Sequence, residues 1–322
     1  MSRYPSNPTM KPFAFVFPGQ GSQSVGMLNA WGDHPAVAAT LAEASAAAGL
    51  DVGGLIHEGP EATLALTVNT QLVMLVAGVA NYRAWLAEGG PLPAAVAGHS
   101  LGEYSALVAA GALALKDAVP LVRFRAQAMQ EAVPVGTGAM MAILGLDGAD
   151  VARACEQAAR DSGQVVSAAN FNDPKQTVIA GSVAGVDMAV TLLKAIGAKR
   201  AMPLAVSAPF HCALMKPAAE RLRERLASTP IATPQIPVIN NIDVAAETDP
   251  DRIRDALVRQ AWGPVRWVEL VGALHARGLR HIFECGPGRV LSKMIKRIEQ
   301  AEAETTTVLD PASLAEARGM LA

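Results

Sequence analysis

A serine flanked by two glycines stands between a predicted strand and a predicted helix. Residues 97–104 are AGHSLGEY; small or apolar residues, 94–98, lead into the serine, and a helix-like run follows at 105–110. G-x-S-x-G in this position is typical of a nucleophile elbow, a sharp turn that presents the serine hydroxyl at the edge of a sheet. Ser100 is therefore the candidate nucleophile. The alternative is a helix cap, in which Ser100 and Glu103 form a capping box.

A nucleophilic serine needs a base, and the chain has six histidines. His211 stands in a loop, SAPFHCAL, from which its side chain could reach a cleft between domains. A buried structural histidine is the commoner case, so both interpretations of His211 stay open on the residues alone. His99 adjoins Ser100, and because neighbouring side chains diverge at a tight turn, a scaffold role is expected for it. The other four lie in loop-like segments (His34, His57), in a helix (His275) or at the start of a strand (His281).

A glycine-rich loop, GQGSQ at residues 19–23, directly follows the first predicted strand. Its glycines would let main-chain N–H groups point at developing negative charge, as an oxyanion hole requires. An ordinary strand-to-helix turn is the alternative. In a nucleophile-elbow fold the second donor is the N–H of the residue after the serine, here Leu101.

Two arginines, Arg123 and Arg125, interrupt an otherwise apolar helical run. Alternate positions on a helix lie about 200° apart, so one of the two is expected to point inward. A buried arginine needs a carboxylate partner, from the protein or from a substrate. On the residues alone, the protein's own carboxylate is favoured.

The composition is that of a compact enzyme-like globule, because 51% of the 322 residues are apolar and 17% are charged. A net charge of -2 without a basic stripe disfavours nucleic acid as a partner. Cys155, Cys212 and Cys285 are widely separated, which indicates a reducing compartment without disulfides or structural zinc, and no metal site is expected. Residues 1–12 lack the apolar stretch of a signal peptide, and no run approaches the ~18 residues of a membrane span, so the cytoplasm is predicted.

Strands that alternate with helices predict an α/β fold with a parallel sheet covered on both faces. After the change of pattern in the middle of the chain, helices and strands alternate again. The tail from residue 301 is rich in alanine and glutamate and is expected to fray. The predicted elements of this large part are strands at 13–17, 94–97, 237–241 and, as the last strand, 280–285, with helices at 70–87, 216–228 and through 251–277.

The middle of the chain predicts a second, smaller domain. Strands at 139–146, 165–170, 176–181 and 200–206 combine with helices over 151–159 and 185–196 in the order β-α-β-β-α-β, which is the ferredoxin-like pattern. We therefore expect a ferredoxin-like domain at 135–206, inserted into a hydrolase-like large domain formed by residues 1–134 and 207–322.

Five segments in this order closely resemble the malonyl-CoA:acyl carrier protein transacylases of fatty acid synthesis. They are FPGQGSQ, GHSLGEYSAL, RAQAMQEAVPVGTGAM, NFNDPKQTVIAG and SAPFHC. The resemblance runs from about Pro12 to Ile298, and GHSLGEYSAL and VPVGTGAM are long enough to be specific. It implies the same two domains, a hydrolase-like large one and a ferredoxin-like small one.

The resemblance also implies a role for individual residues. Ser100 would be acylated, His211 would be its base, and the main-chain N–H groups of Gln20 and Leu101 would form the oxyanion hole. Arg125 rather than Arg123 would bind malonate, the main-chain carbonyl of Gln260 would orient the histidine, and Asn170 and Asn172 match an asparagine pair near the cleft. Phe210 would crowd a branched extender, which favours malonyl over methylmalonyl.

The implied reaction passes malonyl from coenzyme A to the serine and then to the phosphopantetheine thiol of holo acyl carrier protein. Malonyl-CoA and that carrier are the expected partners, no tightly bound cofactor is expected, and the protein is expected to be a monomer. A polyketide-synthesis acyltransferase, a serine hydrolase or thioesterase, and a non-catalytic docking module remain as alternatives. A hydrolase would need a carboxylate for its histidine, and five aspartates lie between Ser100 and His211 in the small domain: Asp147, Asp150, Asp161, Asp173 and Asp187.

Overall fold

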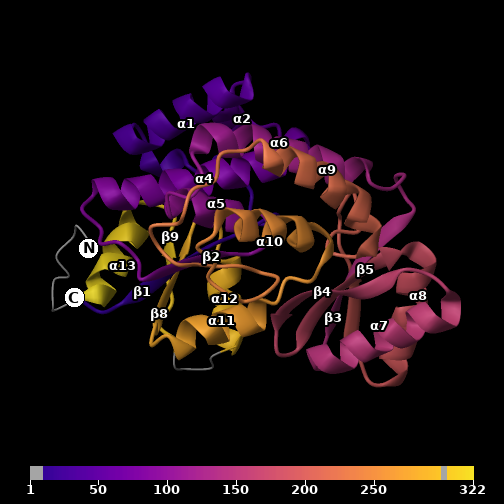
Figure 1. Cartoon of the computed structure of the whole chain (residues 1–322). Coiled ribbons are helices and arrows are strands. Elements are labelled where there is room, and N and C mark those ends of the chain that lie inside the picture. The colour runs from indigo at the N-terminus through magenta and orange to yellow at the C-terminus, as the bar shows by residue number, and fades with distance from the viewer. Residues whose placement is uncertain (1–9, 299–302) are drawn as a thin grey trace.

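A five-stranded parallel sheet forms the centre of the large part of the molecule (Figure 1). The computed structural model describes residues 10–298 and 303–322. Neighbouring strands are parallel throughout this sheet, so their carboxyl ends meet at one edge, where sheets of this kind bind ligands. In spatial order the strands are β7 (Val238–Ile239), β2 (Ala95–Gly98), β1 (Phe13–Phe17), β8 (His281–Cys285) and β9 (Thr307–Val308).

Helices bury both faces of this sheet. The three phenylalanines of β1 lie on one face and the two residues between them on the other, because successive side chains of a strand alternate. The helices α4 (Thr67–Ala87), α5 (Gly102–Ala109) and α6 (Leu115–Glu131) cover the first face. The second face packs against α11 (Trp267–Ala276) and α12 (Val290–Ile298). The predicted α/β architecture is confirmed.

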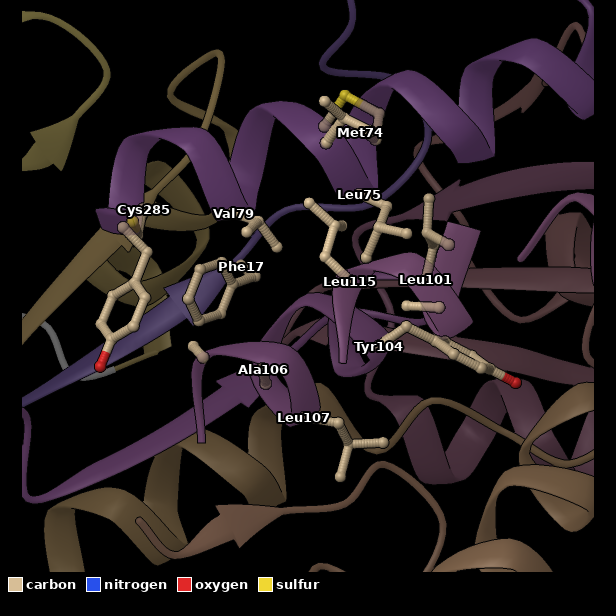
Figure 2. Close-up of a cluster of buried hydrophobic side chains, with 14 of the residues drawn as sticks. Phe17, Met74, Leu75, Val79, Leu101, Tyr104, Ala106, Leu107, Leu115 and Cys285 are labelled. Atoms are coloured by element: carbon tan, nitrogen blue, oxygen red, sulfur yellow. The ribbon is translucent and has the colours of Figure 1, made fainter. Parts of the chain in front are cut away.

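The long helix α4 packs closely on β1 and α5. Figure 2 shows the side chains of Leu75 and Val79 extending from α4 toward Phe17 and toward α5. The sequence predicts a buried helix over 70–87, and the structure begins it at Thr67. Sixteen of its 21 residues are buried, including the polar Gln71.

Five more helices complete the layer outside the sheet. The helix α1 packs against α4 and α6, and α9 packs against α6 and α10. His57, predicted in a loop, lies within α2. Among the described residues, no helix combines the length and apolarity needed to cross a membrane. The five are α1 (Pro35–Ala48), α2 (Val52–Glu58), α3 (Glu61–Leu64), α9 (Lys216–Ala227) and α10 (Pro250–Trp262), with short 3-10 turns η1 (Asn29–Trp31) and η2 (Ala213–Met215).

The middle of the chain forms a separate four-stranded antiparallel sheet, beside the large sheet in Figure 1. The helices α7 (Gly148–Ser162) and α8 (Val183–Ala195) pack on one of its faces. The predicted β-α-β-β-α-β order is confirmed, although the strand expected at 200–206 ends at Pro203. In spatial order the strands are β4 (Val166–Asp173), β5 (Gln176–Ser182), β3 (Gly138–Leu144) and β6 (Arg200–Pro203). The exact domain boundaries, 135–206 for the small domain, stay a prediction.

Two predictions about the C-terminal part are wrong. Strand β8 is not the last strand, because β9 pairs with it in parallel. The described tail, 303–322, is not frayed: α13 (Pro311–Leu321) begins with a capping box at Asp310 and buries Leu314 and Leu321. These leucines, with Ala317 between them, form an apolar stripe at helical spacing that the alanine-rich composition conceals. Residues 1–9, part of the segment examined for a signal peptide, and 299–302, the start of the tail, lie outside the described residues.

Candidate active site

Ser100 lies in a sharp turn between β2 and α5. Its φ of 51° is in the left-handed region, which non-glycine residues adopt rarely and mostly where the surrounding structure enforces it. Both flanking glycines are required because other main-chain atoms lie too close to leave room for a Cβ. A Cβ on Gly98 would lie 1.9 Å from the carbonyl carbon of Gly102, and one on Gly102 would lie 2.0 Å from the Phe17 carbonyl oxygen. The sequence G-x-S-x-G therefore forms the predicted elbow.

Asn241, which follows β7, holds this elbow in place. Its Oδ1 accepts a hydrogen bond from the Ser100 N–H at 2.7 Å, and its Nδ2 donates to the Gly98 carbonyl at 2.6 Å. The capping-box alternative is wrong, because no side chain caps the start of α5. Instead, the Glu103 carboxylate turns inward and accepts hydrogen bonds from the main-chain N–H of Asn241 and from the side chain of Gln260. The strand predicted at 237–241 accordingly ends at Ile239, and the two asparagines after it leave the sheet.

His211 contacts the serine hydroxyl directly. Its Nε2 lies 2.7 Å from Ser100 Oγ, while its Nδ1 lies 2.9 Å from the Gln260 carbonyl oxygen and 3.2 Å from that of Gly263. Carbonyl oxygens only accept hydrogen bonds, so Nδ1 carries the proton in the neutral ring and Nε2 is left as an acceptor. The imidazole is therefore set to take a proton from Ser100.

The electrostatic surroundings keep His211 neutral. Burial, assisted by the positive charge of Arg125, lowers the pKa of His211 to about 3, against the raising effect of the two carbonyl hydrogen bonds. A lowered pKa means that the ring is unprotonated, and so able to act as a base, at any pH well above 3. The acceptors of Nδ1 are main-chain carbonyls and not a carboxylate. The hydrolase alternative requires one carboxylate on this histidine, and none of the five candidate aspartates hydrogen-bonds to His211 in the described part of the chain.

Arg125 is buried beside the serine, with a relative exposure of 1%. Its Nη1 donates to Gln71 Oε1 at 2.6 Å, and its Nη2 donates to Gln260 Oε1 at 3.0 Å and to Ser100 Oγ at 3.2 Å. Within residues 10–298 and 303–322 it forms no ion pair with a carboxylate, so the partner favoured from the residues alone is absent, and two glutamine amides take its place. Burial lowers the pKa of Arg125, but a guanidinium stays protonated in proteins.

Arg123 points away from this site, as the helical spacing predicts. Its Nη1 donates to the main-chain carbonyl of Ala48 at 2.7 Å, on the far side of α6 from Ser100. One of the two arginines is therefore directed inward and the other outward, because two positions on a helix differ by about 200°.

A cavity of about 120 Å³ joins these groups, between the large sheet and the small one. The loop after β1 borders it and packs against the elbow: a Cβ on Gly19 would lie 2.6 Å from the His99 carbonyl oxygen and 3.8 Å from the Leu101 nitrogen. Eight of the residues discussed from the sequence line this cavity: Gln20, His99, Ser100, Leu101, Arg125, Asn170, Phe210 and His211.

Known proteins resemble this chain over nearly its whole length. The family model for the acyl transferase domain matches residues 14–311. The malonyl CoA-acyl carrier protein transacylase of Escherichia coli strain K12 is 56% identical over 290 residues, which cover 90% of this chain and 93% of that protein. The chain belongs to the malonyl-CoA:acyl carrier protein transacylase family. The predicted resemblance to that family is confirmed.

Solved transacylase structures have the same fold. The crystal structure of an acyl-carrier-protein S-malonyltransferase from Burkholderia pseudomallei 1710b is 59% identical and has a TM-score of 0.93, with 96% of this chain and 100% of that one covered. A malonyl-transacylase solved in complex with its type II PKS acyl-carrier protein is 50% identical, also with a TM-score of 0.93, and the same shares of the two chains are covered. These likenesses confirm the fold class.

Two of the residues expected at the transacylase cleft lie beside the cavity and not in its lining. Gln260 contacts His211 through its main-chain carbonyl, the contact implied by the resemblance, and its side chain additionally contacts Arg125. Asn172 Oδ1 accepts a hydrogen bond from His99 Nε2 at 2.8 Å. Burial lowers the pKa of His99, and its ring also packs on Trp267, so this histidine is part of the scaffold.

The sequence alone could not predict the roles of three neighbours of the site. Gln71 is a polar residue in an apolar helix, Asn241 ends the strand predicted at 237–241, and Glu103 occupies the position of a helix-cap partner. In each case the only sequence signal is a polar residue within a buried segment. Such a residue needs a partner, but the identity of the partner depends on the tertiary fold.

Proposed function

We propose that Ser100, His211 and Arg125 transfer a malonyl group from coenzyme A to the phosphopantetheine thiol of an acyl carrier protein, in fatty acid synthesis. The observation that carries this proposal is the combination of a neutral histidine on the serine hydroxyl with a buried guanidinium that has no carboxylate partner in the described part of the chain. The first contact activates a nucleophile, and the second provides a site for the free carboxylate of malonate.

In the first half reaction, Ser100 Oγ attacks the thioester carbonyl while His211 Nε2 takes its proton. The main-chain N–H groups of Gln20 and Leu101 stabilise the oxyanion of the tetrahedral intermediate. The carbon–sulfur bond then breaks, His211 returns the proton to the sulfur, and coenzyme A leaves as a thiol. The malonyl group remains as an ester on Ser100.

The second half reaction reverses these steps with a different thiol. His211 takes the proton of the phosphopantetheine thiol, the sulfur attacks the malonyl ester, and Ser100 leaves with the proton that His211 returns. No redox or metal chemistry enters this sequence. We propose coenzyme A thioester as substrate without a tightly bound cofactor. The monomeric state and the cytoplasmic location stay predictions.

Arg125 binds the free carboxylate of malonate through two parallel hydrogen bonds. In support of this, Arg125 lines the cavity, its Nη2 lies 3.2 Å from Ser100 Oγ, and it has no carboxylate partner among the described residues. Asn170 and Phe210 border the same cavity. We propose that the Phe210 ring crowds a substituent on the α-carbon and so favours malonyl over methylmalonyl.

The transfer reaction is tested by incubating the purified protein with malonyl-CoA and carrier protein in its holo and apo forms. We expect malonyl on the holo carrier only, because the second nucleophile is the thiol of the phosphopantetheine arm. Hydrolysis without carrier should be slow, since the cleft is small and its histidine lacks the carboxylate of a hydrolase triad. Mass spectrometry of both proteins measures the outcome. Equal loading of apo and holo carrier would contradict thioester exchange, and rapid malonate release would favour the hydrolase alternative.

Arg125→Ala should change the choice of acyl group. Malonyl has a carboxylate that acetyl lacks, so loss of the guanidinium should reduce malonyl transfer much more than acetyl transfer. A charge-assisted hydrogen bond contributes about 1.5–3 kcal/mol, so the malonyl-to-acetyl ratio of kcat/KM should fall at least about tenfold. The matched control is Arg123→Ala, which should leave that ratio unchanged because Arg123 contacts Ala48 and not the cavity. Equal losses for both substrates in Arg125→Ala would place the carboxylate site elsewhere.

A further inference from the structure

Glu103 is a buried carboxyl group beside the active site that the proposed reaction does not use. It lies on α5, one turn after Ser100, with a relative exposure of 2%. Its Oε2 accepts two hydrogen bonds, from the main-chain N–H of Asn241 at 2.9 Å and from Gln260 Nε2 at 3.0 Å. Both donors belong to residues that contact the active-site groups, one at the elbow and the other at Arg125 and His211.

Gln260 contacts all three residues of the proposed reaction: the side chains of Arg125 and His211 and the main chain of Ser100. Its Oε1 accepts from Arg125 Nη2, its Nε2 also donates to the Ser100 carbonyl at 2.9 Å, and its main-chain carbonyl accepts from His211 Nδ1. The side-chain amide has one accepting end and one donating end. Rotated by half a turn, it would present an NH₂ group to the guanidinium, and two donors facing each other would repel.

We infer that Glu103 is a positioning residue for acyl selectivity: it fixes the orientation of the Gln260 amide and so holds the Arg125 guanidinium where malonate binds. This inference rests on the proposed function of Arg125. The Glu103 oxygen and the Ser100 carbonyl together draw Gln260 Nε2 away from Arg125, which leaves Oε1 as the end that faces the guanidinium.

The accepting oxygen of Glu103, and not its charge, is the feature that this role requires. Burial raises the pKa of Glu103 to about 7, against the lowering effects of the Gln260 and Asn241 hydrogen bonds and of the Arg125 charge. In either protonation state one oxygen remains able to accept both hydrogen bonds. Glutamine at this position should therefore replace glutamate, whereas aspartate, which keeps the carboxyl group but is one methylene shorter, should not reach Gln260.

The test compares Glu103→Gln with Glu103→Asp. We measure kcat/KM for malonyl-CoA and acetyl-CoA, together with the melting temperature of each variant. Glu103→Gln should keep the malonyl-to-acetyl ratio within about twofold, and Glu103→Asp should lower it about tenfold, the equivalent of one lost hydrogen bond. The loss in Glu103→Asp should appear mainly in KM for malonyl-CoA, because the guanidinium binds the carboxylate.

The matched control is Glu284→Asp. Glu284, in β8, is also a buried glutamate, and it accepts hydrogen bonds from the main-chain N–H groups of Val290 and Ser292 at the start of α12, outside the cavity. Shortening it should reduce stability without changing the ratio. An unchanged ratio in Glu103→Asp, or a ratio lost in Glu103→Gln and kept in Glu103→Asp, would overturn the inference. Malonylation of Ser100 in the wild-type protein reports separately on the proposed function.

Discussion

Ser100→Ala abolishes covalent malonylation while the protein remains folded: this is the expected result of removing the hydroxyl that His211 contacts. No other serine hydroxyl lies in the described lining of the cavity, so no alternative nucleophile of this kind is in place. Alanine has the same backbone preferences at a positive φ as serine to a first approximation, and it adds no bulk to the elbow. Intact-protein mass spectrometry after incubation with malonyl-CoA measures the outcome, with thermal melting as the check on folding.

Ser105→Ala is the matched control for this experiment. Ser105 lies on α5, five residues after Ser100; it is buried, and its hydroxyl has no hydrogen-bond partner among the described residues. Its removal should leave malonylation at one group per chain. A malonyl mass shift that persists in Ser100→Ala would show that another residue is acylated.

The fold could be predicted from the sequence wherever local pattern and burial agree. The run at 13–17 is short, apolar and ended by Pro18, and it forms β1 as expected. The two glycines around Ser100 similarly indicate a tight turn, because main-chain segments approach each other there so closely that a Cβ would not fit. The prediction failed for β9, because two residues are too few to show a strand pattern and their pairing with β8 is a long-range contact.

In the active site, too, residues with a local sequence signal could be predicted and those defined by long-range contacts could not. Ser100 and Arg125 could be singled out because a motif or an unusual polarity marks them. The hydrogen bonds that position them join residues more than 50 positions apart: Gln71 with Arg125, and Asn241 with Ser100. Neither partner has a local signature, because an amide side chain fits many surroundings. Arg125 is an example: its sequence context predicts a carboxylate partner, and in the structure its partners are Gln71 and Gln260.

His211→Ala should slow the acylation of Ser100 by roughly 100-fold to 10,000-fold, which is typical of the loss of a general base. Without the imidazole, the serine hydroxyl has Arg125 as its remaining side-chain neighbour, and a guanidinium cannot accept a proton. Rapid-mixing measurement of the malonyl-enzyme burst gives the rate. The control is His281→Gln, which should keep the wild-type burst. His281 is a buried histidine at the start of β8, outside the cavity. An unchanged burst in His211→Ala would assign the base to another group.

The pH dependence of the wild-type reaction tests the same histidine without a mutation. Because burial and Arg125 lower the pKa of His211 to about 3, the base is deprotonated above that pH, and acylation loses its base only as the pH falls toward 3. The value of kcat/KM should therefore be flat from about pH 5 to pH 8, with no acid limb near 6.5, the ordinary pKa of histidine. A malonyl thioester of a simple thiol is the substrate to use, since the phosphates of coenzyme A titrate in this range. Burial raises the pKa of Glu103 to about 7, so the same profile is measured for Glu103→Gln. An acid limb centred near 6.5 in both proteins would show that the catalytic base is a solvated histidine, which contradicts the buried contact between His211 and Ser100.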